Sequence, residues 1–146
     1  MNVLFFLTPK ATCAYLYVDN TMRQAIEKME NSGYEALPIL NRDGTYYGTL
    51  STGDLLRAVK HDCDLNLAAA EEHTISELKR RRKYQEVPIT MDMRDLLRAA
   101  TQHNFVPVVD DKKAFIGIVT RQAIIRYCLD TYITDADLSE QSVARW

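Results

Sequence analysis

The chain has few of the residues that mark several classes of protein. Among its 146 residues there are only three cysteines, Cys13, Cys63 and Cys128. Because this number is odd and no C-x-x-C pair occurs, the sequence predicts neither a disulfide framework nor a zinc site. We therefore expect a protein of the reducing cytoplasm that needs no metal.

Long apolar runs and an excess of positive charge are also missing. No stretch approaches the roughly 20 consecutive apolar residues that a membrane span requires. The apolar run at 4–7 is too short for a signal peptide and lacks its basic start. The net charge is −2, whereas a protein that coats nucleic acid normally carries a strong basic excess. We expect no membrane association, and nucleic acid is not favoured as a partner.

What the chain does contain is enough apolar sequence for a real core, since 47% of its residues are apolar and 26% are charged. Such a composition is typical of a globular protein rather than a disordered one. No segment is rich in glycine, proline and serine as a flexible linker would be. We therefore expect one packed body rather than two tethered units.

The chain contains an internal duplication. Residues 48–57 have the sequence GTLSTGDLLR, and 69 residues later residues 117–126 have the sequence GIVTRQAIIR. At the same offset, residues 37–41 (LPILN) match residues 106–110 (VPVVD). Upstream of these segments the offset grows to 71 residues, so the second copy is slightly shorter. The period indicates two copies of one supersecondary unit.

Each copy predicts the same series of elements. A helical turn is expected at 3–7. In the first copy, apolar residues recur at helical spacing in 21–31. The sequence NRDG at 41–44 is typical of a hairpin turn. The expected strands of the two copies are 13–18, 36–40, 46–51, 87–89, 105–109 and 115–120. The expected helices are 21–31, 52–59, 93–102 and 121–131, with a further helical stretch at 65–72 between the copies. The order predicts an α+β fold of two βαββα repeats.

From these elements we divide the chain into a first repeat at 3–60, a linker at 61–73, a second repeat at 74–131 and a polar C-terminal tail at 132–146. Two units of this kind resemble a tandem pair of CBS domains (cystathionine β-synthase domains), also called the Bateman module. The resemblance covers about residues 3–130. It rests on the order of elements, the hydrophobic-Pro-Val type of strand, and the Gly-hydrophobic-hydrophobic-Ser/Thr-x-x-Asp ending that recurs in that family.

The resemblance implies an architecture and a class of ligand. The two repeats are expected to pack about a pseudo-twofold axis, with small mixed sheets flanked by helices, and such pairs commonly form disc-shaped homodimers. The usual ligands of the family are adenosine compounds such as AMP, ATP, S-adenosylmethionine or cyclic di-AMP. They are held in clefts between the repeats.

The segment 48–57 has chemistry suited to a nucleotide. Ser51 supplies a hydroxyl at a helix start, where free backbone N–H groups and the helix dipole favour a phosphate. Asp54, three residues later, can accept hydrogen bonds from a ribose diol. The same spacing also fits a capping box, in which Ser51 caps the helix and Asp54 favours its first turn. Both interpretations remain open from the sequence.

The second copy departs from this pattern because Ala123 stands where the aspartate would be. Thr120 still begins the helix, and Arg121 places a guanidinium in its first turn, where it can bind a phosphate bidentately. The helix dipole does not explain an arginine there, since it favours an acidic residue. A solvated surface arginine is the alternative.

This departure resembles the small stand-alone bacterial CBS proteins that bind cyclic di-AMP. They use a Thr-Arg-Arg ending in the second repeat, a tyrosine after glycine in the first, and the opening strand of the first repeat. The resemblance implicates Thr120, Arg121, Tyr34 and Ala14 as ligand-binding residues, with Gln122 in place of the second arginine. Tyr34 can stack on adenine, or it can simply pack beside a core strand.

Residues 79–83 (KRRRK) form the one dense basic run. Such runs usually form a solvated face, but this one precedes the first strand of the second copy, where it can approach a ligand phosphate, an RNA or a partner. His61 and Cys63 resemble half of a metal site, with no further ligands in place. No arrangement of residues suggests a nucleophile with its base or a catalytic carboxylate pair.

We therefore predict a non-enzymatic module that senses an adenine nucleotide, either cyclic di-AMP or AMP/ATP, and requires no cofactor. We expect it to form a homodimer and to regulate an unidentified effector protein in trans. Two alternatives remain open: a scaffold whose clefts are vestigial, and an RNA-associated factor that uses the basic run at 79–83.

Overall fold

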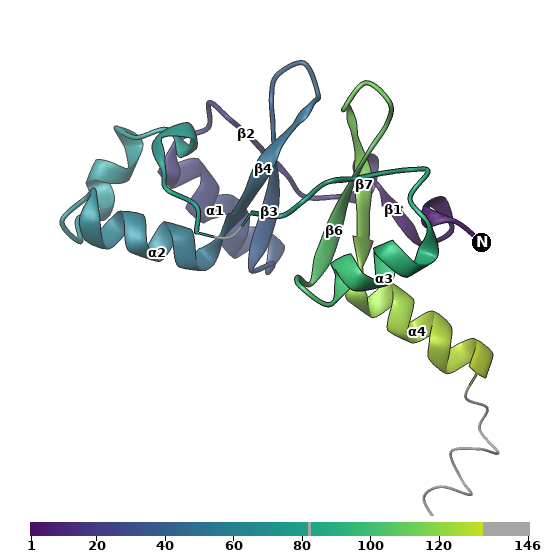
Figure 1. The fold of residues 1–146 in the computed structure, drawn as a ribbon. Coiled ribbons are helices and arrows are strands. Elements are labelled where there is room, and N and C mark those ends of the chain that lie inside the picture. Colours follow the sequence, from purple (N-terminus) through teal and green to yellow (C-terminus); the bar gives the residue numbers. More distant parts are fainter. Residues whose placement is uncertain (82, 133–146) are drawn as a thin grey trace, which may run out of the picture.

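In the computed structural model, which describes residues 1–81 and 83–132, each repeat is a small sheet with helices packed against it (Figure 1). The strands of the first repeat are β2 (Leu16–Tyr17), β3 (Ala36–Leu40) and β4 (Tyr46–Ser51), and its helices are α1 (Met22–Ser32) and α2 (Thr52–His61). The strands of the second repeat are β5 (Val87–Pro88), β6 (Phe105–Val109) and β7 (Phe115–Thr120), and its helices are α3 (Met93–Ala100) and α4 (Arg121–Tyr132).

Both sheets are mixed, and the three strands that belong to each repeat have the same topology. Strand β2 runs parallel to β3, which runs antiparallel to β4, and β5, β6 and β7 repeat this arrangement. Helices α1 and α2 lie on the outer side of the first sheet, so that the two hairpins stand side by side in the middle of the molecule (Figure 1). The structure confirms the predicted α+β fold of two βαββα repeats.

The helix boundaries follow from local sequence. Helix α1 begins with a capping box, in which the Thr21 side chain accepts from the Gln24 N–H and the Gln24 side chain accepts from the Thr21 N–H. It ends at Gly33, whose φ of 72° is a left-handed conformation that glycine adopts without a steric cost. Helix α2 begins at Ser51 with a second capping box.

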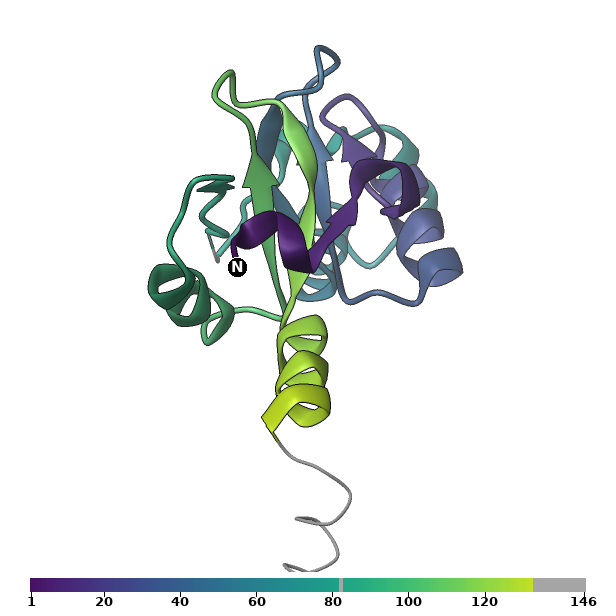
Figure 2. The same cartoon turned by 90° about the vertical axis from the view of Figure 1, so that its right-hand side faces the viewer.

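A segment at the N-terminus crosses from the first repeat to the second. A 3-10 turn at Val3–Phe6, where we expected a helical turn, is followed by β1 (Leu7–Pro9), a strand that the sequence did not predict. Strand β1 pairs antiparallel with β7, as the purple N-terminal segment beside the green strand shows (Figure 2). Gly117 permits this approach, because a Cβ there would collide with the Thr8 carbonyl oxygen.

The two repeats exchange core residues. Val3 and Phe6, which precede the first repeat's sheet, are buried in the core of the second repeat. Ile75 and Leu78, which precede the second repeat's sheet, are buried in the core of the first. Val3 and Ile75, like Phe6 and Leu78, are 72 residues apart, within one residue of the 71-residue offset between the repeats, so the two entering segments occupy corresponding places. Each repeat is therefore completed by chain that leads into the other.

The tips of the two hairpins are joined directly. The Tyr46 N–H donates to the Lys113 carbonyl at 3.1 Å, and the Phe115 N–H donates to the Gly44 carbonyl at 2.9 Å. The rings of Tyr46 and Phe115 stack with centroids 6.4 Å apart. These contacts hold the sheets together at one end, and the clefts described below lie toward the other.

Between the repeats, the helix expected at 65–72 is a short 3-10 turn, Leu67–Glu71, preceded by two residues with positive φ, Asp64 and Leu65. The predicted polar tail at 132–146 lies outside the described residues, except for Tyr132 at the end of α4. Within the part of the chain that is described, no helix has the length and apolar character needed to cross a membrane.

Candidate functional site: two clefts between the repeats

Two cavities lie where the repeats meet, and each includes the residue at which a strand ends and a helix begins. We call the one at Thr120 the second cleft and the one at Ser51 the first cleft. The second cleft has a volume of about 390 Å³ and is lined by Thr120 and Gln122 together with residues from 8–14, 34–38 and 104–118. The first cleft, of about 370 Å³, is lined by residues 51–53 and side chains from both repeats.

The second cleft brings together four of the residues singled out from the sequence: Ala14, Tyr34, Thr120 and Gln122. Ala14 follows the 3-10 turn at Lys10–Thr12, and Tyr34 follows the glycine that ends α1. The Tyr34 side chain is 58% exposed, so its ring is not packed into a core. Residues from the first half of the chain thus face the start of α4 in the second half.

The walls of the second cleft are mostly apolar. Leu37 and Pro38 of β3 lie on one side, and Phe105 and Ile118 of the second sheet lie on the other. Among the residues that the structure describes, no lysine or arginine lines this cleft. An apolar slot with a few polar groups at one end is a typical binding site for a flat heterocycle.

Polar groups of the second cleft gather at the start of α4. The Thr120 hydroxyl accepts from the Ala123 N–H at 3.0 Å, which makes Thr120 the N-cap of the helix. Ala123 cannot return the hydrogen bond as an acidic residue would, so this end carries half of a capping box. The Gln122 carboxamide adds both donors and an acceptor beside it. The arrangement suits an anionic group that receives hydrogen bonds from a helix start.

The guanidinium of Arg121 is not brought into the second cleft. Its Nε donates to the Ala100 carbonyl at 2.9 Å and its Nη2 donates to the Thr101 carbonyl at 3.4 Å. These carbonyls end helix α3, where the last C=O groups lack helical partners and the dipole is negative. Arg121 therefore caps α3 in this structure, and its contact with a ligand phosphate stays a prediction.

Cys13 lines the second cleft, which the sequence analysis did not anticipate. Its thiol donates to the Thr8 carbonyl at 3.4 Å. Burial raises the pKa of this thiol above its ordinary value. Cys13 is adjacent in sequence to Ala14, which the family resemblance had already implicated in ligand binding, and this adjacency could have indicated that Cys13 lines the cleft.

The first cleft contains Ser51, but the Asp54 carboxylate faces away from it. The Asp54 side chain is 3% exposed, and its Oδ2 accepts from the Ser51 N–H at 3.0 Å. Its Oδ1 accepts from Arg57 Nη2 at 2.6 Å and from the Arg81 N–H at 3.3 Å. The capping box that the sequence left open is thus present. A ribose contact by Asp54 stays a prediction, and it requires these bonds to rearrange.

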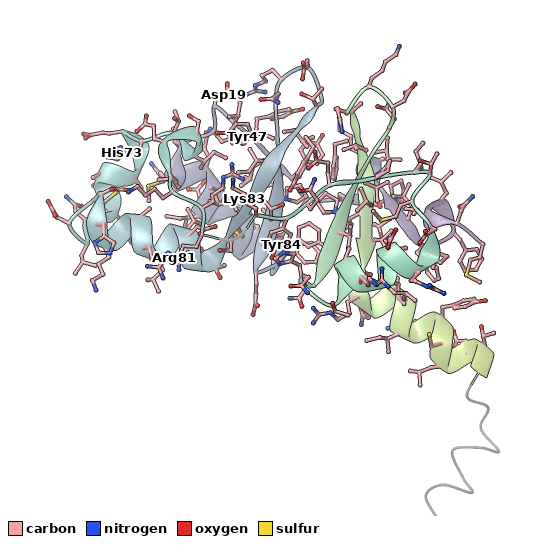
Figure 3. The ribbon with its side chains drawn as sticks, in the orientation of Figure 1. Asp19, Tyr47, His73, Arg81, Lys83 and Tyr84 are labelled. Carbon is pink, nitrogen blue, oxygen red and sulfur yellow. The ribbon has the colours of Figure 1, made fainter. Side chains whose placement is uncertain are left out.

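Tyr84 forms a wall of the first cleft, at the place that Cys13 occupies in the second. Its ring stacks on the His103 imidazole with centroids 3.8 Å apart and an interplanar angle of 17°. Its backbone carbonyl accepts from the Tyr46 hydroxyl at 3.2 Å. Tyr84 lies where the two repeats meet (Figure 3). The two clefts therefore share a plan but differ in the groups that line them.

Across residues 1–81 and 83–132, no group of three or more histidine, cysteine, aspartate or glutamate side chains could hold a metal ion. The half-site suggested by His61 and Cys63 has no further ligands there, and Cys63 is buried in the first core.

Comparison with known proteins agrees with this architecture. The sequence matches the CBS domain family twice, over residues 9–61 and 75–130. An uncharacterized protein of Methanocaldococcus jannaschii, MJ1426, is 28% identical in an alignment that covers 75% of this chain and 82% of that protein.

Two solved structures are also similar. Listeria monocytogenes CbpB in complex with c-di-AMP has a TM-score of 0.79 at 19% identity, covering 90% of this chain and 96% of that one. CBSX2 in complex with AMP has a TM-score of 0.71 at 22% identity, covering 88% and 96%. At these identities the similarity shows a common fold. With two matched domains, two βαββα repeats and clefts at their junction, the chain belongs to the CBS domain family, as a tandem pair of CBS domains.

Proposed function

We propose that this protein is a non-enzymatic regulatory module that binds an adenine nucleotide in its second cleft. One observation carries the proposal: Ala14, Tyr34, Thr120 and Gln122, chosen from the sequence, line a single largely apolar cavity of about 390 Å³. The ligands of two structurally similar proteins, c-di-AMP in CbpB and AMP in CBSX2, support the choice of ligand class.

In this proposal, the adenine enters between the apolar walls and stacks on the exposed ring of Tyr34. The phosphate lies at the start of α4, where it receives hydrogen bonds from backbone N–H groups and from the Thr120 hydroxyl or the Gln122 amide. Since the described lining holds no cation, each phosphate bound there must be neutralised mainly by dipoles. A phosphodiester carries one negative charge, whereas a phosphate monoester carries about 1.5 to 2 at pH 7. We therefore favour cyclic di-AMP over AMP or ATP as the ligand of this cleft.

A ligand in the second cleft bridges the two repeats, because Tyr34 belongs to the first and Thr120 to the second. A nucleotide that fits one relative position of the repeats shifts the population toward it. If Arg121 turns to the phosphate, the end of α3 loses its cap, and the effect of the ligand reaches the outer surface. We propose that an effector protein recognises this change in trans.

We further propose a homodimer in the cytoplasm. Leu56 on α2 and Ile125 on α4 occupy equivalent places in the two repeats, and both are large apolar side chains exposed to solvent. Leu129, one turn beyond Ile125, is exposed as well. A second copy that covers these helices would remove apolar surface from water. The cytoplasm is proposed because the chain has an odd number of cysteines and no C-x-x-C pair.

The proposal is tested by isothermal titration calorimetry with cyclic di-AMP, AMP and ATP, together with thermal unfolding in the presence of each. A true ligand raises the melting temperature through mass action. Replacing Tyr34 with alanine should weaken binding roughly 5- to 150-fold, because base stacking on an aromatic ring contributes about 1–3 kcal/mol. The matched control is Tyr47→Ala, which removes another exposed tyrosine that does not line the second cleft. If none of the three compounds binds at millimolar concentration, the proposal is wrong.

A further inference from the structure

Two segments of the chain pass between the repeats, and the internal duplication places them in corresponding positions. At the 71-residue offset, residues 8–12 (TPKAT) align with residues 79–83 (KRRRK). The purple chain that follows β1 lies on one side of the two hairpins, and the teal chain that leads to α3 lies on the other (Figure 2). The first segment carries a single cation, Lys10, whereas every residue of the second is basic. The fold therefore does not require this basic charge, because the counterpart segment makes the same crossing without it.

Part of the basic segment lines a cavity of the first repeat, between α2 and the chain at 77–81. We call it the basic cavity. Its volume is about 570 Å³, and its cationic residues are Arg57 of α2 together with Lys79, Arg80 and Arg81. Arg81 lies beside α2 (Figure 3). The segment thus contributes to a concave surface, which is what a partner that inserts side chains requires.

Most of the positive charge of the basic cavity has no carboxylate partner. Within residues 1–81 and 83–132, no ion pair involves the side chains of Lys79, Arg80 or Arg81. Arg57, the fourth cation of the lining, pairs with Asp54 at 2.6 Å. The three cations of the basic segment are therefore available to an anionic group from outside.

The acidic residues of the basic cavity compensate little of this charge. Asp54 is engaged by Arg57, and Glu77 forms a hydrogen bond with His73 at 3.1 Å. Asp62, at the end of α2, is the remaining acid of the described lining. Three cationic side chains without an ion pair are thus set against one further acid, so the cavity attracts negative charge.

Arg80 is held in a defined position. Its guanidinium lies directly over Gly48, where a Cβ would overlap it. It also lies over the Tyr47 ring, 4.9 Å from the ring centre, in a cation–π contact. In the second repeat the equivalent positions are Gly117 and Ile116, so the tyrosine is a feature of the first repeat. A side chain that is already ordered loses little entropy when it binds a partner.

The corresponding cavity of the second repeat has a different character. It lies beside α4 and has a volume of about 360 Å³. Its described lining includes Arg126 and Asp130, the counterparts of Arg57 and His61 at the 69-residue offset, and no further lysine or arginine. Aromatic residues of the N-terminal turn form part of its wall. The common plan of the two repeats therefore does not account for the cations of the basic cavity.

We infer that the basic cavity binds an acidic segment of a partner protein, whose glutamate or aspartate carboxylates pair with Lys79, Arg80 and Arg81. A guanidinium can bind a carboxylate through two parallel hydrogen bonds, which fixes the orientation of the partner as well as its affinity. A nucleic acid fits less well. It is bound through successive phosphates along an extended surface, whereas these cations converge on a cavity with Asp62 in its wall. The inference rests on the proposed function only in taking the partner to be the effector protein.

The experiment measures the fluorescence anisotropy of labelled decaglutamate, with decaglutamine as the uncharged probe of the same length. We expect the whole chain to bind decaglutamate and not decaglutamine, with an affinity that falls as salt screens the charges. Arg80→Gln and Arg81→Gln should each weaken this binding roughly tenfold, the scale of one lost charged hydrogen bond. Arg81→Gln keeps the backbone N–H that donates to Asp54. Unchanged thermal unfolding of both variants shows that they are folded.

The matched control is Lys10→Gln. Lys10 aligns with Arg81 at the 71-residue offset. It lies over the Tyr15 ring at 5.4 Å from the ring centre, much as Arg80 lies over Tyr47. The described lining of the basic cavity does not include Lys10. This variant should therefore bind decaglutamate as tightly as the unchanged protein does.

Three results would overturn the inference: equal affinities for decaglutamate and decaglutamine, an effect of Lys10→Gln as large as those of Arg80→Gln and Arg81→Gln, or tighter binding of decauridylate RNA than of decaglutamate. The last result would assign the basic cavity to nucleic acid. The described lining of the second cleft includes none of these three residues, so the two proposals fail separately. Decaglutamate binding without cyclic di-AMP binding would refute only the proposed ligand, and the reverse would refute only this inference.

Discussion

The buried carboxylate of Asp54 offers a quantitative test of how the first repeat is held together. It joins three parts of the chain, since it accepts from the Ser51 N–H, from Arg57, and from the Arg81 N–H in the segment that leads into the second repeat. Replacing Asp54 with alanine leaves these donors without their acceptor. Because the partner charge is also partly buried, we expect the free energy of unfolding to fall by about 3 kcal/mol, the lower end of the range for breaking a buried pair.

Helix α3 provides a matched control. Asp95 occupies the same third helical position as Asp54, and it also pairs with an arginine three residues later, at 3.2 Å. Here, however, the side chains of Arg98 and Asp95 are 72% and 50% exposed. Asp95→Ala should therefore lower the free energy of unfolding by only about 0.5 kcal/mol, as is usual for exposed helical pairs.

The two variants are compared by urea denaturation and by thermal unfolding. For a chain of this size, about 3 kcal/mol corresponds to a fall in melting temperature of roughly 6–12 °C. Asp54→Asn, which keeps the size but not the charge, should lie between the two alanine variants. If Asp54→Ala and Asp95→Ala had equal effects, burial would not be what gives Asp54 its importance, and the reasoning would be refuted.

Three further predictions concern single side chains. Arg121→Gln should lower the free energy of unfolding by about 1–2 kcal/mol in urea denaturation, because the end of α3 loses its cap; an unchanged midpoint would contradict this. Cys13 should react with iodoacetamide more slowly than exposed Cys128, since burial raises the pKa of the Cys13 thiol. Bound cyclic di-AMP should slow the alkylation of Cys13 further and leave that of Cys128 unchanged, as measured by mass spectrometry. The hydrogen bond from His73 lowers the pKa of Glu77. This pair therefore stabilises the fold above the unfolded-state pKa of about 4.3, and the effect is lost as the pH falls through the folded-state pKa. His73→Ala should make the free energy of unfolding depend less steeply on pH in the acid range, and an unchanged slope would argue against the pair.

Most of the fold could be predicted from the sequence because the duplication tests every element twice. The glycines at 48 and 117 and the prolines at 38 and 107 align at one offset, so each weak local signal is supported by its counterpart. Strand β1 escaped prediction because it has only three residues, one of them a proline, and pairs with a strand more than a hundred residues away. No local pattern encodes a partner at that distance.

The candidate site was predictable only in part, for a similar reason. Thr120 and Gln122 follow from the local strand-to-helix motif, but Tyr34 joins them only because the repeats pack face to face, which the family resemblance supplied. The position of Arg121 depends on how α3 ends, about twenty residues earlier in the sequence. For Ser51 and Asp54, spacing alone favours a cap without excluding a ribose site, and the geometry shows the cap.

The crossing of residues 3–9 into the sheet of the second repeat has a consequence for synthesis. Strand β1 leaves the ribosome before its partner β7, which lies more than a hundred residues later in the sequence. Until β7 has been made, Val3 and Phe6 lack the complete core that buries them, and β1 has no strand to pair with. The reciprocal placement of Ile75 and Leu78 in the first core means that neither repeat is complete without the other. We therefore expect the two repeats to fold as one cooperative unit, with the pairing of β7 with β1 as a late step.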